Sequence, residues 1–277
     1  MKTFAAIDVG SYELAMKIFE FSPKTGMKEI DHIRHRIDLG NDTFAAGKIS
    51  YEKVDELCSI LREFADIMKT YRVEGYKAYG TSAIRETDNT AIILDQIRQR
   101  TGISIGVLSN SEQRFLDYKS IALKSADFGK IIEKGTAILD IGGGSIQLSL
   151  FDKDTLVATQ NLRIGVLRLQ ELLDKLNVKP SKHEGLLEEM IDSQLSVFKR
   201  MYLKDRNVEN IIVVDDYVSM LLQKRIAGSQ RSGYVDSEGY GRFMEYLRTH
   251  SKEEAAAHFG VSEESLRLIG ISATLIR

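Results

Sequence analysis

One short pattern occurs twice in the chain, and this repeat constrains the fold more than any other feature. Residues 6–11 (AIDVGS) lead into an apolar run at 14–21, and residues 138–145 (ILDIGGGS) lead into another at 148–151. Each copy is an apolar strand that ends in Asp, then one apolar residue, glycine, a small hydroxyl residue and a returning strand. A unit repeated about half a chain apart predicts two related lobes, not a short tandem array.

The repeated unit has residue types that suit phosphate. Glycine allows a tight turn and a close approach of the backbone, and the exposed turn amides can then donate to phosphate oxygens. Ser11 or Ser145 would add a donor, and Asp8 or Asp140 could hold a cation or orient a water. An ordinary tight hairpin, in which Asp and Gly are common, is the alternative. Two copies, each opening a meander, favour the phosphate site.

Periodicity indicates alternating strands and helices around these units. The segment at 51–71 repeats apolar residues at spacings of three and four, including Cys58, which predicts an amphipathic helix with a buried thiol. The first lobe reads as βββαβαβα, with strands at 3–8, 13–21, 27–38, 75–79 and 103–108 and helices at 51–71, 90–100 and 111–125. The second lobe reads as strands at 136–141, 146–151, 156–162 and 211–214, helices at 166–176 and 182–203, and a mostly helical remainder.

The two lobes are expected at residues 1–126 and 127–277. The chain ends within an apolar helical run from Leu268 to Ile276, which would be costly if left exposed. Either the sequence is cut short, or its last helix closes the fold and packs back towards the first lobe.

Bulk composition excludes several partners. The net charge of −2 gives no general attraction to nucleic acid or to an anionic membrane, and no run of about 18 apolar residues predicts a membrane span. The single cysteine excludes an internal disulfide and fits a reducing compartment. We therefore expect a cytoplasmic protein without nucleic-acid or membrane partners. The oligomeric state stays open, with a homodimer among the alternatives.

Five motifs carry a family resemblance. In order they are AAIDVGS (5–11), YGTSAIRET (79–87), LSNSEQRFLDY (108–118), LDIGGGSIQLSLF (139–151) and LRIGVLRL (162–169). Their order and spacing resemble those of the exopolyphosphatase / guanosine pentaphosphate phosphohydrolase (Ppx/GppA phosphatase) family. The resemblance implies an α/β, two-lobed, actin-like (ribonuclease H-like) fold in which each lobe opens with a β-meander. It also implies Mg²⁺-assisted hydrolysis of a terminal phosphoanhydride in polyphosphate or guanosine pentaphosphate.

The same resemblance assigns roles to individual residues. Arg85 would pair with phosphate oxygens, for which its planar fork is well suited, although a surface salt bridge to Glu86 or Asp88 is the alternative. Asp140 would lie near the metal and the attacking water, with Asp8 as a second metal ligand. The phosphate loops would be formed by Asp8, Gly10 and Ser11, and by Asp140, Gly142, Gly143, Gly144 and Ser145.

Departures from the family pattern fall on the chemistry. The family has two adjacent glutamates where this chain has Glu112 and Gln113, and the second is taken as the base that activates water. An amide cannot accept that proton, and a positioned base typically contributes roughly 10²–10⁴-fold in rate. Glu112 is adjacent, but successive helical residues point about 100° apart. Gln147 likewise stands where the family has Glu after the second glycine loop.

Two further departures concern the loops. The first loop continues with Tyr12 and Glu13, a bulky ring and an anion near the expected phosphate. A Gly- and Thr-rich loop follows a second-lobe strand in the family, but here residues 211–214 run into Asp215 and Asp216, whose carboxylates would repel a polyanion. The glycines of both loops (Gly10, Gly142, Gly143 and Gly144) and Arg85 match the family pattern, whereas the residues expected to carry out catalysis do not.

Three functions follow from these observations. The first is a Mg²⁺-dependent phosphohydrolase, in which Glu112 and Asp140 manage the water and catalysis is impaired. The second is a non-catalytic regulatory protein that binds polyphosphate, a guanosine alarmone or a related ligand. The third is an ATP-driven kinase or chaperone function. It lacks support, because the chain has no glycine-rich adenosine-binding segment after residue 205.

Overall fold

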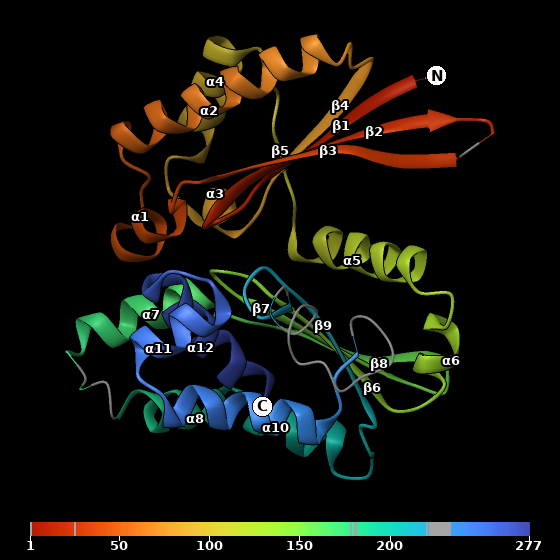
Figure 1. The fold of residues 1–277 in the computed structure, drawn as a ribbon, viewed down its shortest axis with the longest axis vertical. Helices are drawn as coiled ribbons and strands as arrows, with labels where there is room; N and C mark the ends of the chain where they lie inside the picture. Colours follow the sequence, from red (N-terminus) through yellow and green to blue (C-terminus); the bar gives the residue numbers. More distant parts are fainter. Residues whose placement is uncertain (1, 25, 178, 180–181, 220, 222–233) are drawn as a thin grey trace. The chain divides into compact units, whose positions relative to one another are not determined.

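Two compact units, residues 1–115 and 116–277, make up the computed structural model of the chain (Figure 1). The structure describes residues 2–24, 26–177, 179, 182–219, 221 and 234–277. Each unit contains one mixed sheet with helices packed on it. The predicted division at residues 126 and 127 stays a prediction.

Unit 1 is built on a five-stranded sheet with the order β3-β2-β1-β4-β5. The first three strands form an antiparallel meander, and β4 and β5 add in parallel. Its strands are β1 (Lys2–Val9), β2 (Glu13–Ser22), β3 (Gly26–Arg36), β4 (Gly75–Gly80) and β5 (Gly106–Val107). Its helices are α1 (Leu39–Ala46), α2 (Tyr51–Thr70), α3 (Ser82–Glu86) and α4 (Thr90–Thr101).

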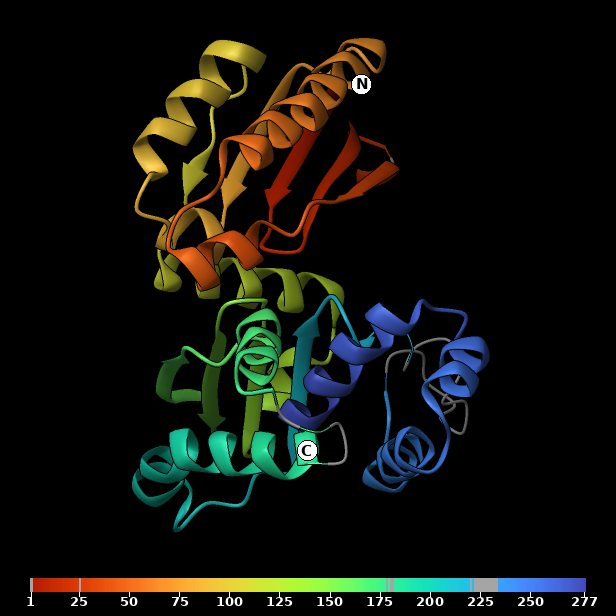
Figure 2. The same ribbon diagram turned by 90° about the vertical axis from the view of Figure 1, so that its left-hand side faces the viewer.

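The core of unit 1 follows from the periodicities in the sequence. Alternate residues of β1 and β2 are buried, because successive side chains of a strand point to opposite faces. The long helices α2 and α4 lie over that face of the sheet (Figure 2). Helix α2 buries the predicted stripe, which includes Leu57, Cys58, Leu61 and Phe64.

Unit 2 is built on a four-stranded sheet with the order β8-β7-β6-β9. Strands β6 (Thr136–Ile141), β7 (Ile146–Asp152) and β8 (Thr155–Leu162) form an antiparallel meander, and β9 (Asn210–Asp215) adds in parallel to β6. Its helices are α6 (Phe128–Ile132), α7 (Val166–Lys175), α8 (His183–Phe198), α10 (Ser237–Thr249), α11 (Lys252–Phe259) and α12 (Glu263–Ile276), with a π-helical turn, η2 (Lys199–Leu203), after α8. Helix α5 (Asn110–Lys124) spans the boundary between the units.

The two faces of the unit 2 sheet are covered by different helices. Leu148 and Leu150 of β7 pack against residues of α8 and η2. On the opposite face, the Tyr118 ring of α5 and the Phe128 ring of α6 both contact Phe151 edge to face. The last helix, α12, is largely buried, and it contacts α7, α8 and α11.

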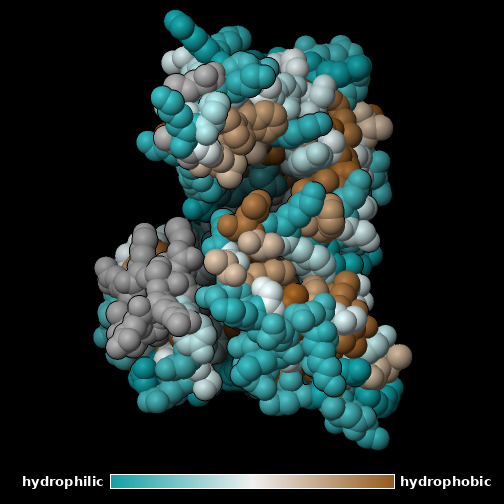
Figure 3. All heavy atoms as spheres, turned by 90° about the vertical axis from the view of Figure 1, so that its right-hand side faces the viewer, coloured by the Kyte–Doolittle hydropathy of each residue, from teal (hydrophilic) through white to brown (hydrophobic). Residues whose placement is uncertain are grey.

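Some local expectations were wrong. The strand expected at 103–108 is only two residues long. The helix predicted at 111–125 is present as α5, but none of its residues is buried and Phe115 is 57% exposed. In the face shown in Figure 3, apolar side chains of unit 1 lie as separate patches among hydrophilic ones.

Among the described residues, no helix combines the length and apolar character that a membrane span requires.

Candidate phosphate-binding loops

The first Asp-x-Gly hairpin closes with one backbone bond. The amide of Gly10 donates to the carbonyl of Glu13 at 3.0 Å, and a Cβ on Gly10 would lie 2.8 Å from that oxygen. Glycine is therefore required at this position. Asp8, at the end of β1, is exposed, and it lies in register with Ala15 of β2 and with Tyr79 of β4.

Side chains around the first turn are engaged within unit 1. The hydroxyl of Ser11 is buried and lies 2.9 Å from the hydroxyl of Ser82. The carbonyl of Ser11 accepts from the amide of Gly40 in α1 at 2.7 Å. The predicted phosphate donor is thus anchored to α1 and α3.

Tyr12 and Glu13 both contact strand β3. Glu13 accepts from Nε of Arg34 at 2.6 Å, and the guanidinium carbon of Arg36 lies 4.7 Å from the centre of the Tyr12 ring. The Glu13 carboxylate is therefore paired with a cation, so its charge is partly neutralised next to the loop.

Arg85 lies on the short helix α3, which follows directly after β4. A Cβ on Gly80 would lie 2.9 Å from Cβ of Ile84, so the turn from β4 into α3 requires glycine. Nη1 of Arg85 donates to the carbonyl of Leu108 at 2.7 Å, which links α3 to the segment that precedes α5.

Glu112 forms the capping box of helix α5. Its Oε2 accepts from the amide of Ser109 at 2.9 Å and from the hydroxyl of Ser109 at 2.7 Å, while the Glu112 amide donates to that hydroxyl at 3.2 Å. The bond from the Ser109 amide, together with that from its hydroxyl, lowers the pKa of Glu112. A carboxylate held in this way is a weaker base and is directed to the helix end. Gln113 is the next residue of the same turn.

The second hairpin closes in the same way, and the helix that follows β8 holds its loop. Gly142 donates to the carbonyl of Ser145 at 3.0 Å. The loop carbonyls are then occupied by the first turn of α7. Specifically, Gly142 accepts from Val166 at 3.0 Å, Gly143 from Leu167 at 2.9 Å and Arg168 at 3.1 Å, and Gly144 from Nε of Arg168 at 3.0 Å.

The amides of the same loop have a different status. In the part of the chain that the structure describes, Gly143 and Gly144 donate no backbone hydrogen bond. Glycine-loop amides without a backbone acceptor are the donors that phosphate oxygens use. The arrangement of held carbonyls and unused amides supports a binding role for this loop.

Gly165 and Arg168 support the loop, and the residue-by-residue prediction omitted both. A Cβ on Gly165 would lie 2.3 Å from the Ser145 nitrogen, 2.4 Å from the Gly144 carbonyl carbon and 2.5 Å from that of Gly143. Only glycine fits such backbone contact. Both residues belong to the LRIGVLRL segment at 162–169, so the motif contained the signal without indicating its partner.

A row of polar residues crosses the sheet beside the second loop. Asp140 of β6, Gln147 of β7 and Asn161 of β8 are in register, so they lie on the same face. Nε2 of Gln147 donates to Oδ2 of Asp140 at 3.3 Å. The side-chain oxygens of Gln147 and Asn161 are buried without a hydrogen-bond partner among the described residues. Buried polar atoms of this kind call for a ligand, water or ion.

Asp140 is the member of this row that was predicted to lie near Mg²⁺. Carboxylate and amide oxygens are the ligands that Mg²⁺ uses, usually one or two carboxylates with the rest supplied by water and phosphate. The described residues contain no group of three or more His, Cys, Asp or Glu side chains suited to a metal. Asp140 thus supplies a single carboxylate here, which is within the one or two that Mg²⁺ takes from a protein when phosphate completes its shell.

Asp215 ends β9, where the notional third loop would begin. Its carboxylate accepts from the amide of Val218 at 2.7 Å, from the amide of Ser219 at 2.8 Å and from the hydroxyl of Ser272 at 2.9 Å. These three donors hold the charge within unit 2 and join β9 to α12. Repulsion of a polyanion by Asp215, as the sequence suggested, is reduced by this arrangement.

Comparison with known proteins identifies the family. The model of the Ppx/GppA phosphatase family matches residues 18–276. The chain belongs to the Ppx/GppA phosphatase family. Exopolyphosphatase 1 of Mycobacterium leprae is 28% identical over 192 residues, which are 69% of this chain and 55% of that protein. Guanosine-5'-triphosphate,3'-diphosphate pyrophosphatase of Aliivibrio fischeri is 25% identical over 162 residues, 58% of this chain and 31% of that protein.

The chain thus spans about half the length, or less, of these curated relatives. A crystal structure of an exopolyphosphatase from Cytophaga hutchinsonii has a TM-score of 0.79 at 19% identity, covering 99% of this chain and 89% of that one. The predicted family and the predicted α/β, actin-like fold, with each sheet opening on antiparallel hairpins, are confirmed.

Proposed function

We propose that this Ppx/GppA family member binds the terminal phosphates of a phosphoanhydride, polyphosphate or guanosine pentaphosphate, and hydrolyses the end anhydride slowly. The observation that supports this most strongly is the hydrogen bonding of the second glycine loop. Its carbonyls are fixed by the first turn of α7, while the Gly143 and Gly144 amides have no backbone acceptor among the described residues. Phosphate oxygens would take those amides without any rearrangement of the loop.

Slow turnover is proposed because the expected bases are changed or occupied. Gln113 and Gln147 are amides, which can orient a water but accept no proton. Glu112 is held by Ser109, which lowers its pKa. Without a positioned base, hydrolysis should run roughly 10²–10⁴-fold below that of an enzyme with one.

Asp140 is the residue proposed to hold Mg²⁺, together with phosphate oxygens. When bound, the ion would offset the charge that the phosphate oxygens carry. The protein's own part is to keep the Asp140 carboxylate in place, through the amide of Gln147. Asp8, in the first loop, is proposed as the metal-binding carboxylate of unit 1.

Restoring the carboxylates tests this function. Phosphate release from polyphosphate and from guanosine pentaphosphate, with Mg²⁺, should rise at least tenfold in the Gln113→Glu, Gln147→Glu double variant. Glu112→Gln is the matched control and should leave the wild-type rate unchanged. Equal and undetectable release from wild type and double variant, both with retained ligand binding, would remove the catalytic part of the proposal.

A second candidate is a non-catalytic protein that binds the same ligands for regulation. The occupied Glu112 carboxylate and the Gln147–Asp140 bond favour it, because both replace hydrolytic groups by structural contacts. Calorimetry with polyphosphate, guanosine pentaphosphate and ATP tests both candidates. Binding without turnover selects the regulatory function, and the absence of binding to all three ligands rules out both.

A further inference from the structure

Unit 2 contains a cavity of ≈ 230 Å³, and none of the site residues predicted from the sequence lines it. It is lined by α7, α8, α10, α11 and α12 and is partly open to solvent, and α12 runs between α7 and α8 on one side and α10 and α11 on the other (Figure 2). The inner wall is apolar and largely buried. It is formed by Leu173, Leu187, Met244, Leu247, Ala255, Leu266 and Ile271.

Gly270 keeps one wall of this cavity clear. It lies in the interior of α12, where glycine weakens a helix relative to alanine. Among the described residues, nothing lies within 4 Å of the position that its Cβ would occupy, so no described neighbour requires glycine. A side chain at this position would extend into open space beside the cavity.

The mouth of the cavity is polar, with several basic side chains. Arg248 is already engaged, because Nη2 donates to Glu184 at 2.7 Å and Nη1 to Glu245 at 3.3 Å. Arg267 pairs with Asp174 through Nη2. These two ion pairs use much of the local charge and leave few donors for a ligand.

Two cationic donors remain at the mouth. Nε of Arg267 is buried and has no hydrogen-bond partner among the described residues. Lys252, at the start of α11, is exposed and forms no ion pair within the same part of the chain. A buried guanidinium N–H without an acceptor is costly, and an anionic oxygen would satisfy it.

We propose that this cavity binds a small amphipathic monoanion, a medium-chain carboxylic acid, with its tail against the apolar wall and its carboxylate at Arg267 and Lys252. The cavity is larger than the space of about 150 Å³ that accepts benzene in an engineered protein core. It is smaller than most drug-sized pockets, which start at about 300 Å³. Octanoate therefore matches both the volume and the charge.

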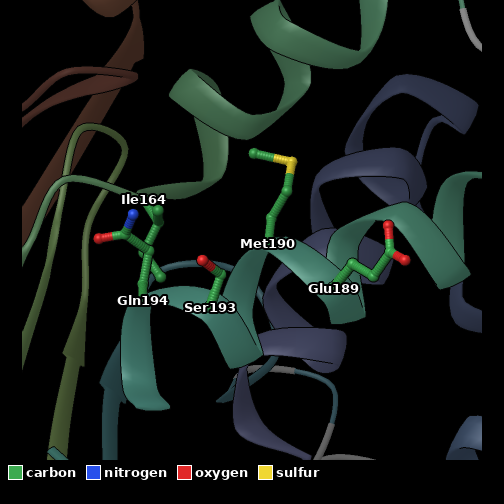
Figure 4. Close-up of a pocket in the computed structure, with 5 residues that line it drawn as sticks. All are labelled: Ile164, Glu189, Met190, Ser193 and Gln194. Atoms are coloured by element: carbon green, nitrogen blue, oxygen red, sulfur yellow. The ribbon is translucent and has the colours of Figure 1, made fainter. Parts of the chain in front are cut away.

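Another hollow in unit 2 lacks these properties. It has a volume of ≈ 370 Å³ and lies between Ile164 and one side of α8. In Figure 4, Met190, Ser193 and Gln194 extend from α8, and Gln194 lies beside Ile164. Its only charged residue among the described lining is Glu189, which would repel an anion. The two hollows thus differ in the chemistry that the proposal needs.

Calorimetry on the full chain tests the proposal, with octanoate, octanol and acetate as the three probes. Octanoate should bind saturably at one site, octanol at least about tenfold more weakly because it lacks the charge, and acetate not measurably. Octanoate should also raise the melting temperature. Saturable binding of none of the three, or equal binding of octanol and octanoate, would overturn the proposal.

Three variants locate the site. Gly270→Leu fills the cavity and should abolish octanoate binding, whereas Gly241→Leu, at an exposed helical glycine of α10 that also has nothing within 4 Å of its Cβ, should not change it. Lys252→Gln, at an exposed position, should lower the affinity for octanoate by about three- to tenfold and leave the affinity for octanol unchanged. Unchanged octanoate affinity in a folded Gly270→Leu variant, or in Lys252→Gln, would contradict the assignment.

Discussion

The two Asp-x-Gly hairpins share their internal geometry but differ in what surrounds them. Asp8 lies opposite Ala15 and Asp140 opposite Gln147, seven residues on in each case, and both turns close with a glycine amide donating three residues ahead. In unit 1 the loop carbonyls receive three backbone amides, those of Ile37 and Asp38 at Tyr12 and that of Gly40 at Ser11. In unit 2 the first turn of α7 and a guanidinium occupy all three loop carbonyls.

This difference indicates where each hairpin is specialised. The unit 1 turn adds side-chain contacts with β3 and α3 to the backbone bonds at its carbonyls. The unit 2 loop is held through its backbone, which leaves amides for a ligand. The parallel strands next to β1 and β6 differ too. Strand β4 ends in Gly80, which makes a tight turn, and β9 ends in Asp215, whose carboxylate accepts backbone amides.

The largest expected effect comes from Gly165→Ala. The new Cβ would overlap three backbone atoms at 2.3 to 2.5 Å, which rigid backbone can relieve only by moving the loop or α7. We expect the free energy of unfolding of unit 2 to fall by about 3 kcal/mol or more, with phosphate-ligand binding lost. Urea unfolding measures this. Gly185→Ala in α8, where nothing lies within 4 Å, is the control and should stabilise slightly.

Asp215→Ala should give the second-largest loss of stability. The change leaves two backbone amides and the Ser272 hydroxyl without their acceptor, which should cost about 2 kcal/mol of unfolding free energy. The midpoint of urea unfolding reports this loss, and the exposed Asp205→Ala is its control. If Asp215→Ala instead raised affinity for polyphosphate without loss of stability, the carboxylate would act mainly by repelling the ligand.

Paired glycine substitutions compare the two turns directly. A Cβ on Gly10 meets the Glu13 carbonyl at 2.8 Å, whereas one on Gly142 meets the Ser145 carbonyl at 3.4 Å, an ordinary contact. Gly10→Ala should therefore lower the free energy of unfolding by about 1 to 2 kcal/mol. Gly142→Ala should change it by no more than about 0.5 kcal/mol. Thermal unfolding of each variant checks the order, and equal costs would mean that the two turns are equally tight.

The hairpins were predictable because their signal is local. Apolar alternation, Asp and glycine lie within one short segment, so strand, turn and returning strand follow from neighbouring residues. The support of the second loop was not predictable in the same way. Gly165 lies twenty positions after Ser145, and nothing in its own segment reveals that its Cα packs on that loop backbone.

The roles of the carboxylates show the same limit. The S-x-x-E pattern from Ser109 to Glu112 is a capping signature, yet the neighbouring family motif favoured a chemical role for Glu112. The direction of the Asp215 side chain depends on Ser272, which is distant in sequence and becomes a neighbour only through the packing of α12. Local pattern thus predicted the elements, and tertiary contacts determined what the charged groups do.

Glu112→Gln should have the smallest effect and a distinct pH dependence. Ser109 lowers the pKa of the folded carboxyl below the ordinary value of 4.5, so its stabilising contribution is complete above that pH and is lost as the pH falls through the folded value. The melting temperature of wild type should therefore exceed that of Glu112→Gln slightly near pH 7, and the difference should vanish in acid. Phosphate release should be equal in the two proteins at pH 7. A rate that fell about 100-fold in Glu112→Gln would instead make this residue the base that activates water.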